Sequence, residues 1–415
     1  MKRITALIMS KLSLLLLIQS AVSFTTSCSS GKGDSVPAYE ASNPPDYSYF
    51  EVFAQDDDNT ILSVANTEQV LDTTEPPATQ PPTFPPATEP PSTSPPTEPP
   101  EVQTAGIGLL ILKDRLAEKF TISSEHISKY TSAINKLYNE CGKPDTYIIT
   151  PPCAAQLYLP DKYINNTNDQ YIAFDELASS VNGPKYIDLK DSFEKHKNEY
   201  IYFKTDHHWT ALGAYYAYEA FINAIGMTPT KLSEYKSGSK SGFKGSLYTA
   251  LSSYPQYESF NNLSDDVSYY IPKHNAKVIS YQSADLIDGQ ERLLINPNYS
   301  DSSNLYNIFL GGDIPIGYIH SDIGNGKSIM VIRDSYGHAF LPFLVDNFEY
   351  IYSVEPRYFK PSFFGKTANI IILSTFLQEK QIDTLLFLNY SLSATSGYWL
   401  AWGDELQKLS GDYTQ

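Results

Sequence analysis

Residues 204–210 place three titratable side chains in a row, Asp206-His207-His208, in a chain that has only 7 histidines. In an extended conformation alternate side chains share a face, so Asp206 and His208 are expected to point together and His207 away from them. A carboxylate beside an imidazole fixes the tautomer of the ring and stabilises its protonated form, as a general base requires. We therefore predict that Asp206 orients His208 and that His208 accepts a proton.

A second segment, residues 329–338, could supply the group that loses this proton. A buried apolar strand is expected to lead into Asp334-Ser335, with a helix from about Ser335 onward. A serine at such a turn lies near helix N–H groups, which can stabilise an oxyanion. Taken alone, Asp334 or Ser335 could merely cap the helix. Because the Asp206-x-His208 pair offers the base that a serine needs, Ser335 is the predicted nucleophile.

Two other interpretations of the histidine pair stay open. His207 and His208 could be structural residues at a helix start, or they could bind a metal ion with a further ligand from elsewhere. Adjacent histidines rarely bind one ion together, so no metal is expected. Cys28, Cys141 and Cys153 are too few for a disulfide scaffold or a structural zinc site. The net charge of -17 argues against a nucleic-acid-binding protein, and no cofactor is expected.

These residues need elements to position them, and the sequence predicts alternating strands and helices. Apolar stretches separated by helices are typical of a parallel sheet covered on both faces, with ligands at the carboxyl ends of the strands. The expected strands are residues 108–112, 146–149, 186–189, 328–332, 350–353, 370–373 and 384–388. The expected helices are residues 124–140, 174–181 and 210–225, and one from about residue 335.

Residues 228–305 interrupt this alternation. They are rich in Ser, Tyr, Lys and Asn, with short expected strands only near residues 268–270 and 278–279. The segment is too long for a plain crossover, so we interpret it as an insertion. It either covers or shapes a site or has no role in binding. Beyond it, Gly311-Gly312 is expected to form a tight turn.

The first 101 residues are expected to export and tether a domain formed by residues 102–415. Residues 1–27 have the basic start and short apolar stretch of a secretory signal peptide, and the small residues before Cys28 resemble a bacterial lipobox. We therefore predict that Cys28 is lipidated. Residues 28–73 are acidic and expected to be disordered. Residues 74–101 repeat Pro-Pro, which favours a semi-rigid polyproline II spacer.

The Asp-His-His-Trp sequence at residues 206–209 and the Arg-Asp-Ser-Tyr block at residues 333–336 resemble the signatures of the bacterial DHHW proteins. These in turn resemble the SGNH-like domains of periplasmic alginate O-acetyltransferase proteins, in which an Asp-x-His pair also precedes the serine. The resemblance spans roughly residues 102–415. It implies a three-layer α/β fold of the SGNH-hydrolase or flavodoxin-like kind, with a mostly parallel sheet, and a Ser335-His208-Asp206 triad. One departure is Arg333, which stands where GDSL esterases have glycine.

The resemblance also implies a function. The chain is expected to be an exported lipoprotein, anchored to the membrane on its extracytoplasmic side, that acts on O-acetyl or other ester groups of an extracellular or cell-wall carbohydrate. Its expected partners are an acetylated carbohydrate or an acyl-donor protein, and the candidate substrate contacts are His207, Trp209, Arg333 and Tyr336. The enzyme would be a carbohydrate O-acetyltransferase or an acetylesterase. The alternative is a non-catalytic cell-surface carbohydrate-binding or assembly protein on the same fold.

The anchoring prediction can be tested by Cys28→Ser. Serine cannot carry the lipid that the thiol would carry, and lipid chains are what hold such a protein at a bilayer. We expect the variant to move from the membrane fraction to the soluble fraction, as measured by fractionation and immunoblotting. Cys141→Ser is the matched control and should stay with the membrane. Retention of Cys28→Ser in membranes at the wild-type level would contradict the prediction.

Overall fold

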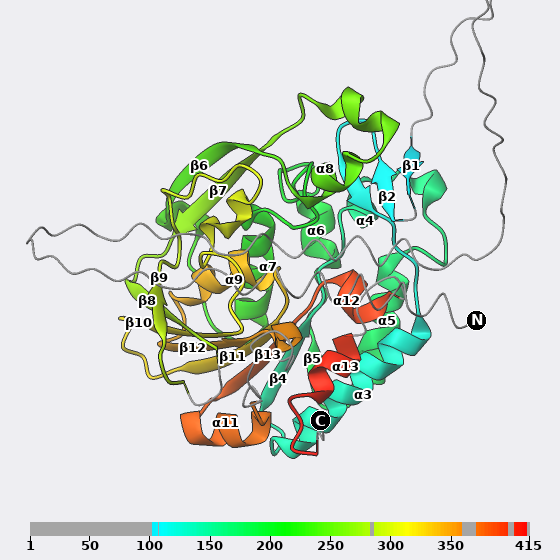
Figure 1. Cartoon of the computed structure of the whole chain (residues 1–415). Coiled ribbons are helices and arrows are strands. Elements are labelled where there is room, and N and C mark those ends of the chain that lie inside the picture. Colours follow the sequence, from blue (N-terminus) through cyan, green and yellow to red (C-terminus); the bar gives the residue numbers. More distant parts are fainter. Residues whose placement is uncertain (1–101, 107, 283–285, 359–370, 397–401, 413–415) are drawn as a thin grey trace, which may run out of the picture. The chain divides into compact units, whose positions relative to one another are not determined.

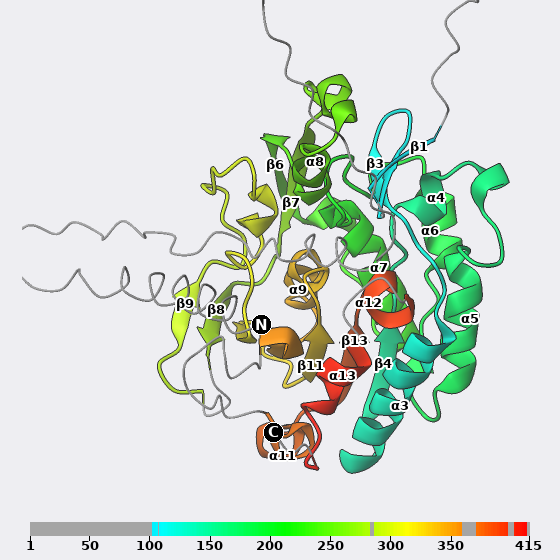
Figure 2. The same cartoon turned by 45° about the vertical axis from the view of Figure 1, so that its right-hand side comes forward.

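A computed structural model of the chain describes residues 102–106, 108–282, 286–358, 371–396 and 402–412 (Figures 1 and 2). The predicted signal peptide, acidic segment and proline spacer lie outside the described residues. The lipidation of Cys28 therefore stays a prediction. Within the described part of the chain, no helix is both long enough and apolar enough to cross a bilayer.

The central element is an eight-stranded sheet with the order β5-β4-β13-β11-β12-β10-β8-β9. The strands from β5 to β12 in this order run parallel, and β10, β8 and β9 continue the sheet in antiparallel pairing. The strands are β4 (Asp145–Ile149), β5 (Lys185–Tyr186), β8 (Ala276–Tyr281), β9 (Gln290–Arg292), β10 (Ile316–Ser321), β11 (Ser328–Arg333), β12 (Tyr350–Val354) and β13 (Thr384–Leu388). Strand β11 is buried along its whole length, as expected for a parallel strand covered on both faces.

Helices cover both faces of the parallel part of the sheet (Figures 1 and 2). The crossovers β4–α5–β5 and β11–α9–β12 run in opposite directions along the sheet, so right-handed connections place α5 (Gln170–Ser180) and α9 (Gly337–Leu344) on opposite faces. Helix α5 packs against α3 (Ser124–Glu140), and α9 packs against α7 (Ala211–Ala224). The result is the predicted three-layer α/β fold with a mostly parallel sheet.

Most of the predicted elements are confirmed. The helix predicted at residues 124–140 is α3 with the same bounds, and Ser123 caps it by accepting the N–H of His126. Thr210 caps α7 in the same way, by accepting the N–H of Gly213. The shorter helices are α4 (Ala155–Tyr158), α6 (Lys190–His196), α8 (Ser246–Leu251), α11 (Leu373–Lys380), α12 (Ser391–Thr395) and α13 (Trp402–Gln407).

Three predicted strands differ from the structure. Residues 109–111 form β2, but β2 pairs with β1 (Gln103–Ala105) and β3 (Leu116–Glu118) in a separate antiparallel sheet, because a tight turn brings β3 back onto it. The strand predicted at residues 370–373 is wrong for its described part, residues 371–373, since Leu373 begins α11. A short apolar run does not distinguish a strand from a helix start. Of the strand predicted at residues 186–189, only Tyr186 lies in a strand, because β5 ends there.

The predicted insertion packs into the domain at several places. Strands β6 (Lys236–Phe243) and β7 (Asp265–Ile271) form a two-stranded antiparallel ribbon, and β8 and β9 extend the edge of the central sheet. Helix α8 packs against the sheet formed by β1 to β3. Beyond the insertion, Gly311 and Gly312 have φ angles of 71° and 95°, and the N–H of Gly312 donates to the carbonyl of Phe309, as a tight turn requires.

Candidate active site

Three side chains from two distant segments form a continuous hydrogen-bonded chain. Oδ1 of Asp206 lies 2.6 Å from Nδ1 of His208, and Nε2 of the same ring lies 2.8 Å from Oγ of Ser335. Asp206 and His208 are buried, whereas Ser335 is partly accessible between buried neighbours. This geometry lets the imidazole take the Ser335 proton while the carboxylate holds the opposite ring nitrogen.

The loop that carries Asp206 and His208 is bent, whereas the sequence analysis assumed an extended segment. An antiparallel bridge between Tyr202 and Trp209 closes the loop at its base. Oδ1 of Asp206 also accepts the backbone N–H of His208 at 2.9 Å. The carboxylate therefore holds both the ring and the backbone of the residue two positions later, and this pairing depends on the bend.

His207 does not point away from Asp206 and His208, and the prediction that it would is wrong because the loop is not extended. The ring centroids of His207 and His208 are 3.8 Å apart. Nδ1 of His207 lies 2.6 Å from Oγ of Ser246. The backbone carbonyl of His207 accepts a hydrogen bond from the hydroxyl of Tyr336 at 2.5 Å. His207 therefore joins the loop to the insertion and to the turn after β11.

Burial and charge set the protonation of the two side chains beside His208. Burial alone would raise the pKa of Asp206, but the neighbouring imidazoles and the hydrogen bonds from His208 and from the Ser246 N–H lower this pKa well below its usual range. Burial, followed by the charge of His208, lowers the pKa of His207 to about 3. At neutral pH Asp206 is therefore an anion and His207 is a neutral ring. The anion can compensate the positive charge when His208 accepts a proton.

The turn that carries Ser335 is fixed by the carboxylate before it. Asp334 accepts the backbone N–H of Tyr336 at 3.0 Å and that of Tyr390 at 2.9 Å, which ties the end of β11 to the segment after β13. The predicted helix begins at Gly337 rather than at Ser335. Asp334 thus stabilises the turn, and Ser335 directs its hydroxyl to His208. Among the described residues, none accepts a hydrogen bond from the Ser335 N–H.

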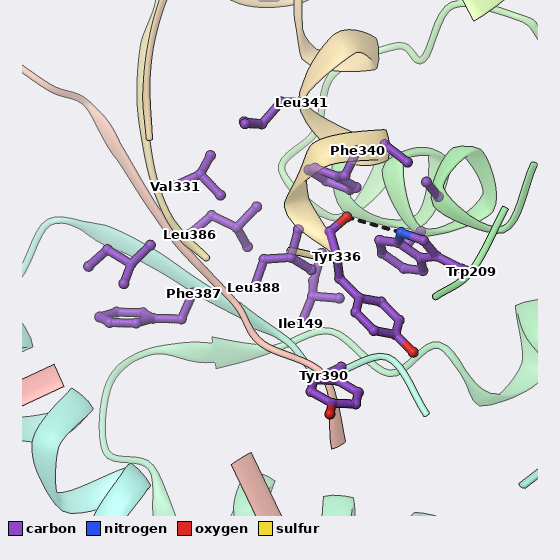
Figure 3. Packing of buried hydrophobic residues seen from close by; sticks show 14 of the residues in the cluster. Ile149, Trp209, Val331, Tyr336, Phe340, Leu341, Leu386, Phe387, Leu388 and Tyr390 are labelled. Atoms are coloured by element: carbon purple, nitrogen blue, oxygen red, sulfur yellow. Dashed lines mark hydrogen bonds between the residues drawn. The ribbon is translucent and has the colours of Figure 1, made fainter. Parts of the chain in front are cut away.

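Three of the predicted substrate contacts are fully buried: Trp209, Arg333 and Tyr336. Nε1 of Trp209 donates to the carbonyl of Tyr336 at 3.0 Å, and Figure 3 shows the Trp209 ring beside Tyr336 and near Phe340 of α9. The same view shows Tyr336 near Ile149 and Leu388, at the ends of β4 and β13. Arg333 forms a buried ion pair with Glu355. These residues therefore support the turn from within the core. His207, the fourth predicted contact, is also buried.

The insertion holds the loop through two contacts that the sequence analysis did not name. The N–H of Ser246 donates to Oδ2 of Asp206 at 2.8 Å. The carboxylate of Asp265 accepts the backbone N–H groups of Lys204 and Thr205 at 2.8 and 2.7 Å. Of the two interpretations left open for the insertion, these contacts favour the one in which it shapes the site.

Tyr306 is a further residue that the sequence analysis missed. It lies just beyond the insertion, in a single turn of 3-10 helix, η5 (Leu305–Ile308). Its ring is stacked on that of His208, with centroids 4.0 Å apart and an interplanar angle of 11°. Its hydroxyl donates to the carbonyl of Ser335 at 3.2 Å. No local sequence pattern marks this residue, since it is one tyrosine among 32.

In the described part of the chain, two groups of histidines and carboxylates bring together side-chain atoms of the kinds that bind metal ions. They are Asp206, His207 and His208, and Asp313, His338 and Glu355. In the first, Nδ1 of His208 and the Asp206 carboxylate already bind each other. In the second, the Arg333 guanidinium lies 2.8 Å from Nε2 of His338 and pairs with Glu355, which puts a fixed positive charge among the donors. We propose no metal site at either place.

Comparison with known proteins relates this chain to a family. A family model described as DHHW protein matches residues 103–354, and no curated protein matches the chain. A crystal structure of a DHHW family protein from Eubacterium siraeum is similar with a TM-score of 0.60 and 25% identity, over 74% of this chain and 99% of that one. Bacillus cereus PatB1 with a sulfonyl adduct is similar with a TM-score of 0.56 and 18% identity, over 70% of this chain and 96% of that one. The O-acetyltransferase domain of Pseudomonas putida AlgJ is similar with a TM-score of 0.40 and 14% identity, over 72% of this chain and 98% of that one.

Gly245→Ala tests how closely the insertion packs on this loop. A Cβ atom at position 245 would lie 2.3 Å from Cβ and 2.4 Å from Oδ2 of Asp206. Overpacking of this kind costs about 1–3 kcal/mol, and we expect the free energy of unfolding in urea to fall by that amount. Gly411→Ala is the control, because its nearest contact is an ordinary 3.8 Å to Ile372. Equal stability of the two variants would contradict the proposed close packing.

Proposed function

The chain belongs to the DHHW protein family, and from this membership and the geometry at Ser335 we propose that it is an extracytoplasmic enzyme acting on ester-linked acyl groups. The favoured substrate is an O-acetylated carbohydrate of the cell envelope. The observation that carries the proposal is the hydrogen-bonded chain from Asp206 through His208 to the hydroxyl of Ser335, a residue that is only partly buried. The lipid anchor rests on the sequence around Cys28 alone.

In the first half of the proposed reaction, Oγ of Ser335 attacks the acyl carbonyl carbon while Nε2 of His208 takes the hydroxyl proton. The Asp206 carboxylate holds Nδ1–H and compensates the charge of the imidazolium. The tetrahedral oxyanion needs preorganised donors, and the Ser335 N–H has no acceptor among the described residues. When the carbon–oxygen bond to the leaving alcohol breaks, His208 returns its proton to that alcohol. Ser335 is then acylated.

In the second half, a hydroxyl compound attacks the acyl group on Ser335, and His208 takes its proton as before. The departing Oγ of Ser335 is reprotonated by His208, so the enzyme returns to its starting state. With water as the attacking compound the reaction is hydrolysis, and with a carbohydrate hydroxyl it is acyl transfer. The same three side chains serve both outcomes, and access to the acyl group decides between them.

The nucleophile can be tested without knowing the natural substrate. A structure of the B. cereus relative carries a sulfonyl adduct, so a sulfonyl fluoride is a suitable probe for an activated serine here. We expect one sulfonyl group per chain, located on Ser335 by peptide mass spectrometry. Ser335→Ala and His208→Ala should both prevent labelling, because the hydroxyl is weakly nucleophilic unless the imidazole takes its proton. Ser259→Ala, at an exposed serine, should label like the wild type.

Turnover gives the second test. Ser335→Ala and His208→Ala should each lower kcat/KM for an activated acetyl ester by about 10³-fold or more, and the double variant should lose little beyond either one, since the residues act as a unit. Acetate release from an O-acetylated polysaccharide would extend the result to the proposed substrate. A folded Ser335→Ala variant with wild-type turnover would rule out the triad. A wild-type chain that neither labels nor turns over any acetylated substrate would favour the non-catalytic binding or assembly protein.

A further inference from the structure

Tyr306 contacts both ends of the His208–Ser335 pair, although it comes from neither of their segments. Its ring lies flat against the imidazole of His208, and its hydroxyl binds the backbone carbonyl of Ser335. The side chain is buried, so its geometry is fixed by packing against Phe203 and Phe309, whose ring centroids lie 6.2 and 5.5 Å away. A residue in this place can act on the base and on the nucleophile at once.

A parallel aromatic ring favours the charged form of its neighbour over the neutral form. The face of a phenol carries partial negative charge, and it attracts a cation whose centre lies within about 6 Å. The Tyr306–His208 separation of 4.0 Å is inside this range. Burial also raises the pKa of the Tyr306 hydroxyl well above its usual range, so the ring stays a neutral phenol at all working pH values.

We propose that Tyr306 is a positioning residue that stabilises the imidazolium form of His208 and so makes it a stronger base toward Ser335. This inference rests on the proposed function, because the imidazolium forms when the Ser335 proton is taken. The proton moves from Oγ of Ser335 to Nε2 of His208, and Tyr306 exchanges no proton. The ring lowers the energy of the state after transfer, and its hydroxyl holds the Ser335 backbone in reach.

Other groups also face His208, and their effects have to be separated from that of Tyr306. Asp206 supplies a negative charge from the same loop, and the adjacent His207 is neutral at working pH. From the turn after β11 and from α9, the facing groups are Asp334, Ser335, Tyr336 and His338. Tyr306 itself contacts two of them, since its hydroxyl donates to the carbonyl of Ser335 and its ring centroid lies 5.9 Å from that of His338. A comparison between two variants that both lack the hydroxyl therefore leaves the Ser335 contact out and reports the effect of the ring.

The experiment compares Tyr306→Phe, which keeps the ring, with Tyr306→Leu, which removes it. The full chain, labelled at its histidines, is titrated by NMR, and the His208 resonances are assigned with His208→Gln. We expect Tyr306→Leu to lower the titration midpoint of His208 by about one pH unit relative to Tyr306→Phe, given the usual strength of a buried cation–π contact. The rate of sulfonyl labelling at Ser335 falls at low pH as His208 becomes protonated, and the midpoint of this fall should move to lower pH by the same amount. Tyr299→Leu, at a half-buried tyrosine near η5, should move neither.

A fluorinated phenylalanine at position 306 covers the case in which Tyr306→Leu does not fold. It has nearly the shape of phenylalanine but a weaker ring charge distribution, so the midpoint should again fall relative to Tyr306→Phe. Equal midpoints for the fluorinated and unfluorinated rings would overturn the proposal. If the wild type fails to label at all, the proposed function fails, but the NMR midpoints still report the effect of the ring.

Discussion

The buried charge on Asp206 is the constraint on which the rest of the site depends. A carboxylate taken out of water has to be compensated by charge and hydrogen bonds, or it destabilises the fold. Asp206 receives these from the ring and backbone of His208 and from the backbone N–H of Ser246. Its own loop offers only part of this set. The remainder has to come from the insertion, which therefore must pack where it does.

A second buried carboxylate, Asp265 of the insertion, is compensated in a similar way, by groups of the loop just before Asp206. It accepts the N–H groups of Lys204 and Thr205 and the hydroxyl of Thr205, although burial raises its pKa. Both carboxylates are satisfied only when the insertion and the loop are in contact. The loop itself has only one short antiparallel bridge among the described residues, between Tyr202 and Trp209. Its contact with the insertion is therefore what fixes the orientation of the His208 side chain. The insertion and the site are in this sense one structural unit.

The fold was predictable where the signal is local. The helix at residues 124–140 and the strand at residues 328–332 follow from local patterns of apolar residues. Ser335 could be named because it follows this strand and because the Asp206-x-His208 pair offers the base that a serine needs. The direction of His207 could not, because the alternation rule assumed an extended backbone and the loop is bent. Nor could Asp265 or Tyr306, since each meets the site across a long stretch of sequence. Such contacts are set by packing, and no spacing in the sequence encodes them.

The packing of Arg333 explains what this residue does at a position where a related motif has another residue. It stands where GDSL esterases have glycine, and in this structure its guanidinium joins the end of β11 to Glu355, directly after the parallel neighbour β12. The long side chain needs space beside the turn. Gly337 provides it, because a Cβ atom there would lie 2.6 Å from Cδ of Arg333. A small residue at the first position of α9 thus leaves room for Arg333, and the strand end that precedes Ser335 is held by a buried ion pair.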